Sequence, residues 1–274
     1  MPVISTNTAA NTAVRYLNIN ADDQSDSLAK LASGSRINRA SDDAAGLAIS
    51  TRIQSDVAAL SQAQTNASHG ISVLQTADGG AANISDILQR MKSLASQAAS
   101  GTVTDTERTY IDAEFQQLID EIDGIATSTR YNQQSLLDGT SAFGSGITVM
   151  VGSSSSDTIT VTIADMDAAA LSVDSLSVIN QSDANAAITA LDTAIDSVSK
   201  ARADLGATMS RFEFRSDSIA TQQENLEAAN SAIADVDIAS EQAKLSSAEV
   251  KTQAAVAAAA QANQMPQELL KLLQ

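Results

Sequence analysis

The sequence predicts a mainly α-helical protein: a long antiparallel helical bundle with a small β-hairpin region, plus paired N- and C-terminal helices. Apolar residues recur in steps of three and four over two very long segments, residues 44–99 and 188–233. The two prolines, Pro2 and Pro266, lie near the ends, so the backbone between them is free to form long helices. Aromatic residues make up only 3% of the chain, which suits close helix–helix contact better than a thick core.

The most regular stripe belongs to the helix predicted at residues 188–233. Its d-type positions are all apolar: Leu191, Val198, Leu205, Phe212, Ile219, Leu226 and Ile233. Its a-type positions begin with Ile188 and Ile195 and become polar at Ser216, Gln223 and Asn230. Polar a-positions fix the register between packed helices, and a helix of this length extends roughly 70 Å.

The helical segment 44–99 carries a stripe that changes phase in its middle. The first part follows Ile53, Val57, Leu60, Ala67, Ile71 and Leu74, and the second follows Ala77, Ala81, Ile84, Leu88, Met91, Ala95 and Ala98. The offset of three residues is typical of a stammer, a local change in helix supercoiling. Gly79 and Gly80 lie at this point, and each is expected to weaken the helix by about 1 kcal/mol.

A shorter helix and a hairpin complete the bundle. Thr104 and Glu107 have the spacing of a capping box, which places a helix start there after a turn at Gly101. The stripe of this helix is Ile111, Phe115, Leu118, Ile122 and Ile125. Alternating β-branched residues then predict two strands, Ile147–Val149–Val151 and Ile159–Val161–Ile163, within an otherwise polar and irregular region of about 140–182.

The hairpin tip, residues 152–157 (GSSSSD), is expected to be a flexible loop. It carries a run of four serines that are candidates for O-linked glycosylation: Ser153, Ser154, Ser155 and Ser156.

Charge and composition exclude several classes of function. A formal charge of −17 disfavours nucleic acid and anionic membrane surfaces as partners. No run of about 18 apolar residues occurs, so no membrane insertion is expected. The chain has no cysteine and one histidine, His69, so we expect no catalytic, cofactor-binding or metal site and no enzyme activity. The three carboxylates between Asp235 and Glu241 are expected to form a solvated face.

Stretches near both ends of the chain resemble the signatures of bacterial flagellins, the subunits of the flagellar filament. Near the N-terminus these are LASGSRINRASDDAAGLAIS (residues 31–50), NASHGISVLQTADGG, LQRMKSLASQA and DEIDGIATSTRYNQQSLLDG. Near the C-terminus they are RADLGATMSRFEFR and AAVAAAAQANQMPQELLKLL. The resemblance covers roughly residues 1–165 and 183–274, and only a short stretch separates the hairpin from the last long helix. It therefore implies a minimal flagellin without outer inserted domains.

The resemblance implies that the chain has two domains with different roles. Residues 1–43 and 234–274 would pair as an inner terminal coiled-coil domain in the filament core, and residues 44–233 would form the helical bundle around it. The modest apolar content of the ends cannot bury enough surface alone, so these residues need neighbouring subunits. The polymerisation residues named on this ground are Val14, Leu17, Leu28, Leu31, Leu269, Leu270, Leu272 and Leu273.

The resemblance also implies partners and a location. They are other copies of the chain in a helical homopolymer, the flagellar export apparatus with an export chaperone, and the filament cap and hook-junction proteins. The chain would be secreted into the extracellular flagellar filament, where it serves motility. A patch similar to the family's innate immune receptor site comprises Leu88, Gln89, Arg90, Leu94, Gln97 and Glu114.

Two alternatives stay open at this point. A hook–filament junction protein shares the terminal signatures, although such proteins depart more in the first helical region. A helical signalling or adaptor protein would need a sensing or membrane segment, and the sequence offers none.

Overall fold

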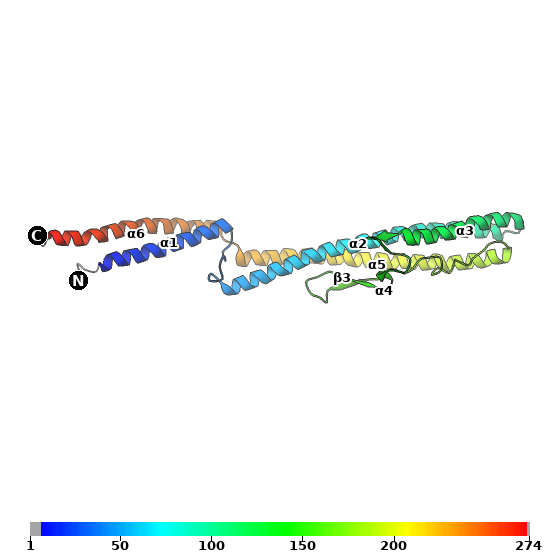
Figure 1. The fold of residues 1–274 in the computed structure, drawn as a ribbon, viewed down its shortest axis with the longest axis horizontal. Coiled ribbons are helices and arrows are strands. Elements are labelled where there is room, and N and C mark those ends of the chain that lie inside the picture. The colour runs from blue at the N-terminus through cyan, green and yellow to red at the C-terminus, as the bar shows by residue number, and fades with distance from the viewer. Residues whose placement is uncertain (1–6, 273–274) are drawn as a thin grey trace. The chain divides into compact units, whose positions relative to one another are not determined.

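The structure is a computed structural model that describes residues 7–272, with side chains up to residue 265, and it has the predicted mainly α-helical fold (Figure 1). The helices are α1 (Thr8–Ser33), α2 (Ala44–Ala99), α3 (Asp105–Ser128), α4 (Ala142–Ser145), α5 (Gln181–Ala234) and α6 (Ile238–Leu272). The strands are β1 (Arg130–Tyr131), β2 (Gln134–Ser135), β3 (Ile147–Met150) and β4 (Thr158–Val161). The chain forms two compact units: a terminal unit (Met1–Ser55 with Asn225–Gln274) and a bundle unit (Asp56–Glu224).

In the terminal unit, α1 and α6 lie side by side and run antiparallel (Figure 1). Asn7 caps α1 by accepting from the backbone N–H of Ala10, and its side-chain amide donates to the carbonyl of Ala262 at 2.8 Å. Towards the opposite end of α1, the side chain of Ser27 lies beside Glu241 near the start of α6. The predicted pairing of N- and C-terminal helices is therefore confirmed.

The turn after α1 explains why the stretch from residue 31 to 50 is rich in polar and small residues. Gly34 adopts a left-handed conformation (φ 72°), and its N–H closes the helix on the carbonyl of Lys30 at 2.9 Å. The carboxylate of Asp42 accepts from the backbone N–H groups of Asn38 (3.0 Å) and Arg39 (2.9 Å). These two hydrogen bonds hold the pKa of Asp42 below its ordinary value, so the turn is fastened by a charged side chain.

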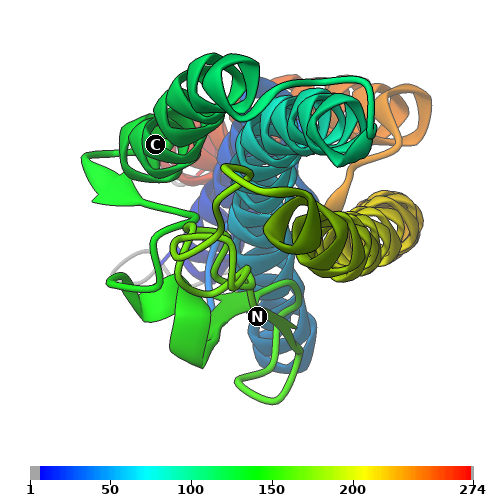
Figure 2. The ribbon, with the colours of Figure 1, turned by 90° about the vertical axis from the view of Figure 1, so that its right-hand side faces the viewer.

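In the bundle unit, α2, α3 and α5 pack lengthwise, and the hairpin lies at one side of them (Figure 2). Side chains of α2 and α5 bond in antiparallel order: Gln64 with Ser216, Asp78 with Arg202 at 2.8 Å, and Lys92 with Asp192. The largest fully buried side chains are Phe115, Phe212, Leu60, Leu74, Ile84, Leu88, Met91, Ile122, Leu136, Leu137, Ile163 and Met166. Ser216, a polar a-position of the predicted stripe, thus makes a contact that fixes register.

Helix α2 runs unbroken through its two central glycines. Gly80 is buried, and a Cβ there would lie 2.6 Å from Oγ1 of Thr129 and 2.7 Å from Cδ1 of Leu137. Gly79 faces open space. The two glycines therefore differ in their role. Gly80 lets the chain after α3 approach the α2 backbone, whereas no packing contact requires a glycine at position 79.

Alanine substitutions at these adjacent glycines are expected to have opposite effects on stability. Gly79→Ala should raise the free energy of unfolding by about 0.5–1 kcal/mol, because alanine favours the helix and meets no neighbour. Gly80→Ala should lower it by about 1–3 kcal/mol, because the added methyl overlaps Thr129 and Leu137. Urea unfolding of both variants measures this, and two changes of the same sign would contradict the explanation.

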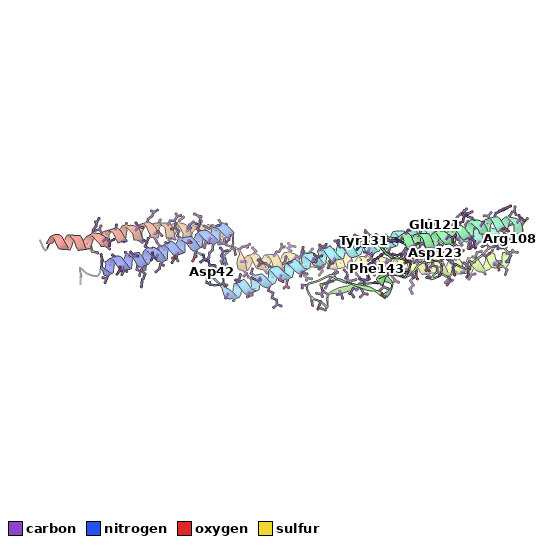
Figure 3. All side chains as sticks on the ribbon, in the orientation of Figure 1. Asp42, Arg108, Glu121, Asp123, Tyr131 and Phe143 are labelled. Carbon is purple, nitrogen blue, oxygen red and sulfur yellow. The ribbon has the colours of Figure 1, made fainter. Side chains whose placement is uncertain are left out.

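Helix α3 begins at the predicted capping box, in which Thr104 and Glu107 satisfy each other's backbone N–H groups. Its buried stripe differs from the predicted one, because Ile119 and Ala126 lie in the core while Leu118 is only half-buried. Arg108, labelled in Figure 3, is almost fully buried and donates to the carbonyls of Ala98 (2.8 Å) and Ser100 (3.0 Å). It therefore closes the C-terminal end of α2.

Strands β3 and β4 form the predicted hairpin, with Ile147 opposite Val161 and Met150 opposite Thr158. The two ends of the hairpin tip contact helix α5. Arg215 of α5 forms an ion pair with the carboxylate of Asp157 at 2.8 Å and donates to the carbonyl of Val151 at 2.9 Å, while residues 153–156 between them are exposed.

The segment after β4 corrects the expectation of a polar, irregular region. It lacks regular structure, but it buries Met166, Val173 and Val178. Asp112 of α3 accepts from the backbone N–H of Val178 at 2.8 Å, and Asp123 accepts from that of Ala168 at 2.8 Å. This loop is therefore part of the core of the bundle unit.

Candidate functional site

Helix α1 leaves most of its apolar side chains uncovered. Only Ala10 and Ser27 are buried along its length. Of the predicted polymerisation residues, Val14 is 46% and Leu28 is 58% exposed, while Leu17 and Leu31 are half-buried. Tyr16 and Ile19, which were not among the predicted residues, are exposed on the same helix.

Helix α6 has the same character. Ile238, Val250, Val256 and Met265 are exposed. None of these four was among the predicted residues, because the weak apolar periodicity of this alanine-rich helix indicates no single face. The predicted residues Leu269, Leu270 and Leu272 lie on the α6 backbone beyond the described side chains, and Leu273 lies outside the described residues.

Together the two helices present a large surface that suits contact with other molecules. Each covers one face of its partner, and the remaining apolar side chains point to solvent. A single exposed leucine is ordinary, but two long paired helices with eight such large side chains between them are typical of an interaction surface. We call these side chains the terminal apolar set: Val14, Tyr16, Ile19, Leu28, Ile238, Val250, Val256 and Met265.

A buried carboxylate lies between α1 and α6, which corrects the expectation of a solvated face from Asp235 to Glu241. Glu241 is only 4% exposed, although Asp235 and Asp237 are exposed. Lys244 donates to Glu241 at 2.9 Å, and Ser27 of α1 lies beside the carboxylate. The Lys244 hydrogen bond comes first among the influences that lower the pKa of Glu241, and it outweighs the effect of burial.

The proposed receptor patch divides into buried and accessible parts. Leu88 is fully buried and Leu94 nearly so, which removes both from the accessible surface of the folded chain. Gln89, Arg90, Gln97 and Glu114 are exposed. Arg90 of α2 and Glu114 of α3 form an ion pair at 2.6 Å, so these four side chains lie along one α2–α3 surface.

The serines at the hairpin tip are accessible. Ser153, Ser154, Ser155 and Ser156 are all exposed, and the hydroxyls of Ser154 and Ser156 lie 3.0 Å apart. The geometry leaves their hydroxyl groups open to a modifying enzyme.

The described residues also bear on two other classes of site, metal sites and membrane spans. Among the side chains described between residues 7 and 265, histidine and acidic groups do not gather in threes as a metal ion would require. Over the same range, no helix has both the length and the apolar character needed to cross a bilayer.

Comparisons with known proteins agree with the paired terminal helices. The model of the bacterial flagellin N-terminal helical region matches residues 4–142, and that of the C-terminal helical region matches residues 188–273. The chain is 39% identical to the flagellar filament 30.7 kDa core protein of Treponema maltophilum, over 99% of each chain. It is 38% identical to the flagellin of Halalkalibacterium halodurans, over 99% of each, and to that of Bacillus subtilis, over 98% of this chain and 99% of that one.

Solved structures share the fold. Bacillus cereus flagellin has a TM-score of 0.52 at 36% identity, covering 61% of this chain and 94% of its own. A putative flagellar hook-associated protein from Vibrio parahaemolyticus has a TM-score of 0.58 at 16% identity, covering 71% of this chain and all of its own. The second likeness extends to the fold alone.

Proposed function

The chain belongs to the bacterial flagellin family and is a structural subunit of the flagellar filament, and from this premise we propose that α1 and α6 are its polymerisation element. In this proposal the two helices are disordered in the free subunit and become ordered when the subunit joins the filament. The predicted inner domain of residues 1–43 and 234–274 would be the part that orders in the filament core.

The observation that supports this proposal is the terminal apolar set. Exposing these side chains to water is unfavourable by about 25 cal/mol per Å² of apolar surface, and the α1–α6 pair cannot cover them alone. A neighbouring subunit can cover them with a different part of its own surface. Such a contact does not close on itself, so it generates an open helical polymer.

The same premise supports a set of finer proposals. The chain would travel through the flagellar export apparatus with an export chaperone, and it would reside outside the cell between hook-junction proteins and the filament cap. The accessible patch around Arg90 and Glu114 would contact a neighbouring subunit or an innate immune receptor. Ser153–Ser156 would accept O-linked sugar. The proposed role is structural rather than enzymatic.

Nothing favours the hook–filament junction protein as an alternative. The relatives that match almost the whole chain are named flagellins and flagellar filament core proteins. The hook-associated structure shares the fold at only 16% identity.

Electron microscopy of the purified protein, seeded with filament fragments in moderate salt, tests the function. We expect long filaments of uniform diameter. A junction protein would give short caps on the seeds or no polymer at all, and either result would contradict the proposal.

The rate of polymerisation is expected to rise from low to moderate salt. Each subunit carries a formal charge of −17, and approaching subunits repel one another. Added salt shortens the screening length to about 8 Å near physiological ionic strength, which weakens that repulsion. Light scattering across a salt series measures the rate. A rate independent of salt would mean that complementary charges on the contacting faces outweigh the net charge.

Acid is expected to loosen the α1–α6 pair in the filament through Glu241. Because the pKa of Glu241 is lowered in the folded state, its carboxylate form stabilises the pair. That contribution is complete above the ordinary value of 4.5 and is lost as the pH falls through the lower folded-state pKa. Filament disassembly followed by light scattering from neutral pH to well below 4.5 measures it.

Two variants make the pH experiment specific to Glu241. Glu241→Gln should lack this component of the acid-induced disassembly, whereas Glu249→Gln, at an exposed position on the same helix, should keep it. If the Glu241→Gln and wild-type profiles coincide, the buried carboxylate has no part in the acid response.

A further inference from the structure

The two connections within the terminal unit are hydrogen-bonded to each other. Ser35, in the connection between α1 and α2, forms a β-bridge with Asp235, in the connection between α5 and α6. The N–H of Arg36 donates to the carbonyl of Ala234 at 2.6 Å, and the N–H of Val236 donates to the carbonyl of Gly34 at 3.1 Å. We call residues 34–36 with 233–236 the linker clasp.

The side chain of Arg36 adds a second layer to the clasp. Its Nε and Nη2 groups donate to the carbonyl of Ile233 at 3.2 Å and 2.5 Å. Helix α5 ends at Ala234, and the last carbonyls of a helix have no partner inside it. The Arg36 guanidinium therefore closes the end of α5 from a linker that lies far away in the sequence, through charge-assisted hydrogen bonds.

We propose that Arg36 is a positioning residue that makes the two terminal helices order together. One side of the clasp leads directly back into α1, and the other leads directly into α6. When the clasp is closed, the last turn of α1 and the first turn of α6 are held close together, which raises the effective concentration of one helix for the other. This inference rests on the proposed ordering of α1 and α6 during assembly.

The chain provides a matched control three residues further along. Arg39 lies in the same connection and makes an ion pair with Asp26 at 3.6 Å, in which both side chains are more than half exposed. An ion pair of this kind contributes little to stability. Arg39→Gln therefore removes the same charge as Arg36→Gln without touching the clasp.

The test uses the full chain as wild type, Arg36→Gln, Arg36→Lys and Arg39→Gln. Hydrogen exchange is measured on filaments of each, and the melting of each free subunit is followed by circular dichroism. For Arg36→Gln we expect exchange to speed up by about tenfold along both α1 and α6, including their distal halves, the scale that corresponds to losing a charge-assisted hydrogen bond. Arg36→Lys should show a smaller increase, since an ammonium cannot reproduce the fork of donors, and Arg39→Gln should match wild type.

Each outcome decides the proposal. The proposal would be overturned if α1 and α6 exchanged as slowly in the Arg36→Gln filament as in the wild-type filament. Faster exchange confined to the clasp, with distal α1 and α6 still protected, would also overturn it, because Arg36 would then be only a local cap. If Arg36→Gln forms no filaments alone, isotope-labelled variant incorporated as a minority into wild-type filaments gives the same readout.

Hydrogen exchange of the wild-type free subunit tests the proposed ordering on assembly separately from the role of Arg36. If the wild-type free subunit already protects α1 and α6, the proposed ordering on assembly is wrong, whatever the variants show. If the wild type orders its tails on assembly and the Arg36 variants behave as wild type, only the role of Arg36 is wrong. Unchanged melting of all free subunits shows that the bundle unit is folded in every variant.

Discussion

Removal of residues 1–40 and 234–274 is expected to abolish filament formation while leaving a folded, helical fragment. The bundle unit keeps its core, including Phe115, Phe212 and Leu74, which are fully buried within it. The fragment loses α1 and α6, and with them the terminal apolar set that needs neighbouring subunits. Circular dichroism should show cooperative melting, and electron microscopy with wild-type seeds should show no growth.

Removal of one end should be almost as severe as removal of both. In the chain lacking residues 1–40, α6 loses the helix that covers one of its faces, and the proposed polymerisation element is incomplete. We therefore expect both single truncations to fail to elongate seeds. Filaments formed by the double truncation would mean that another surface drives polymerisation. Loss of cooperative melting in the fragment would mean that the bundle unit depends on the tails.

Phe212→Ala is expected to lower the free energy of unfolding of the bundle unit by about 3–5 kcal/mol. The ring of Phe212 on α5 is fully buried against the backbone of α2 at Gly70. A Cβ at Gly70 would lie 2.9 Å from Cζ of Phe212, so the ring fills the space that the glycine leaves. The substitution removes the ring and leaves a cavity with no side chain at Gly70 to fill it.

Phe214→Ala provides the control for this substitution. Phe214 lies two residues away on the same helix and is 76% exposed, so its removal should change the free energy of unfolding by no more than about 0.5 kcal/mol. Urea unfolding of the fragment 41–233 measures both variants without interference from assembly. Similar losses for the two phenylalanines would contradict the packing described for Gly70.

The long helices were predictable because local signals and tertiary packing agree along them. The predicted bounds of α2, residues 44–99, match the structure, and α3 starts at the predicted capping box of Thr104 and Glu107. In α5 the polar a-position Ser216 meets Gln64, as a register-fixing contact requires. The apolar periodicity predicted these helices, because a helix that packs along its whole length must repeat its apolar face.

The features that the sequence did not reveal depend on partners far away in the chain. Glu241 is buried where α6 packs against α1 beside Ser27, and the residues next to Glu241 in the sequence give no sign of that distant neighbour. The packed loop that buries Met166 and Val173 has no period, because its contacts come from α3 rather than from a repeating face. Strands β1 and β2 have only two residues each, too few for alternation to appear.

The candidate site was only partly accessible to sequence reasoning. Leu88 belonged both to the apolar stripe of α2 and to the receptor patch, and the structure places it fully in the core. The apolar periodicity of α2 therefore predicted the burial of Leu88 correctly, whereas its similarity to the receptor patch implied an accessible side chain. Tyr16 and Val250 could not be predicted as exposed, because the sequence does not show which face of each helix its partner covers.

Hydrogen exchange on the free subunit and on the filament tests the central claim most directly. The account predicts that amides of α1 and α6 exchange freely in the free subunit, while the cores of α2, α3 and α5 are protected. On assembly, the α1 and α6 amides should become protected in step with filament growth. Protection of α1 and α6 already present in the free subunit would contradict the coupling of their folding to assembly.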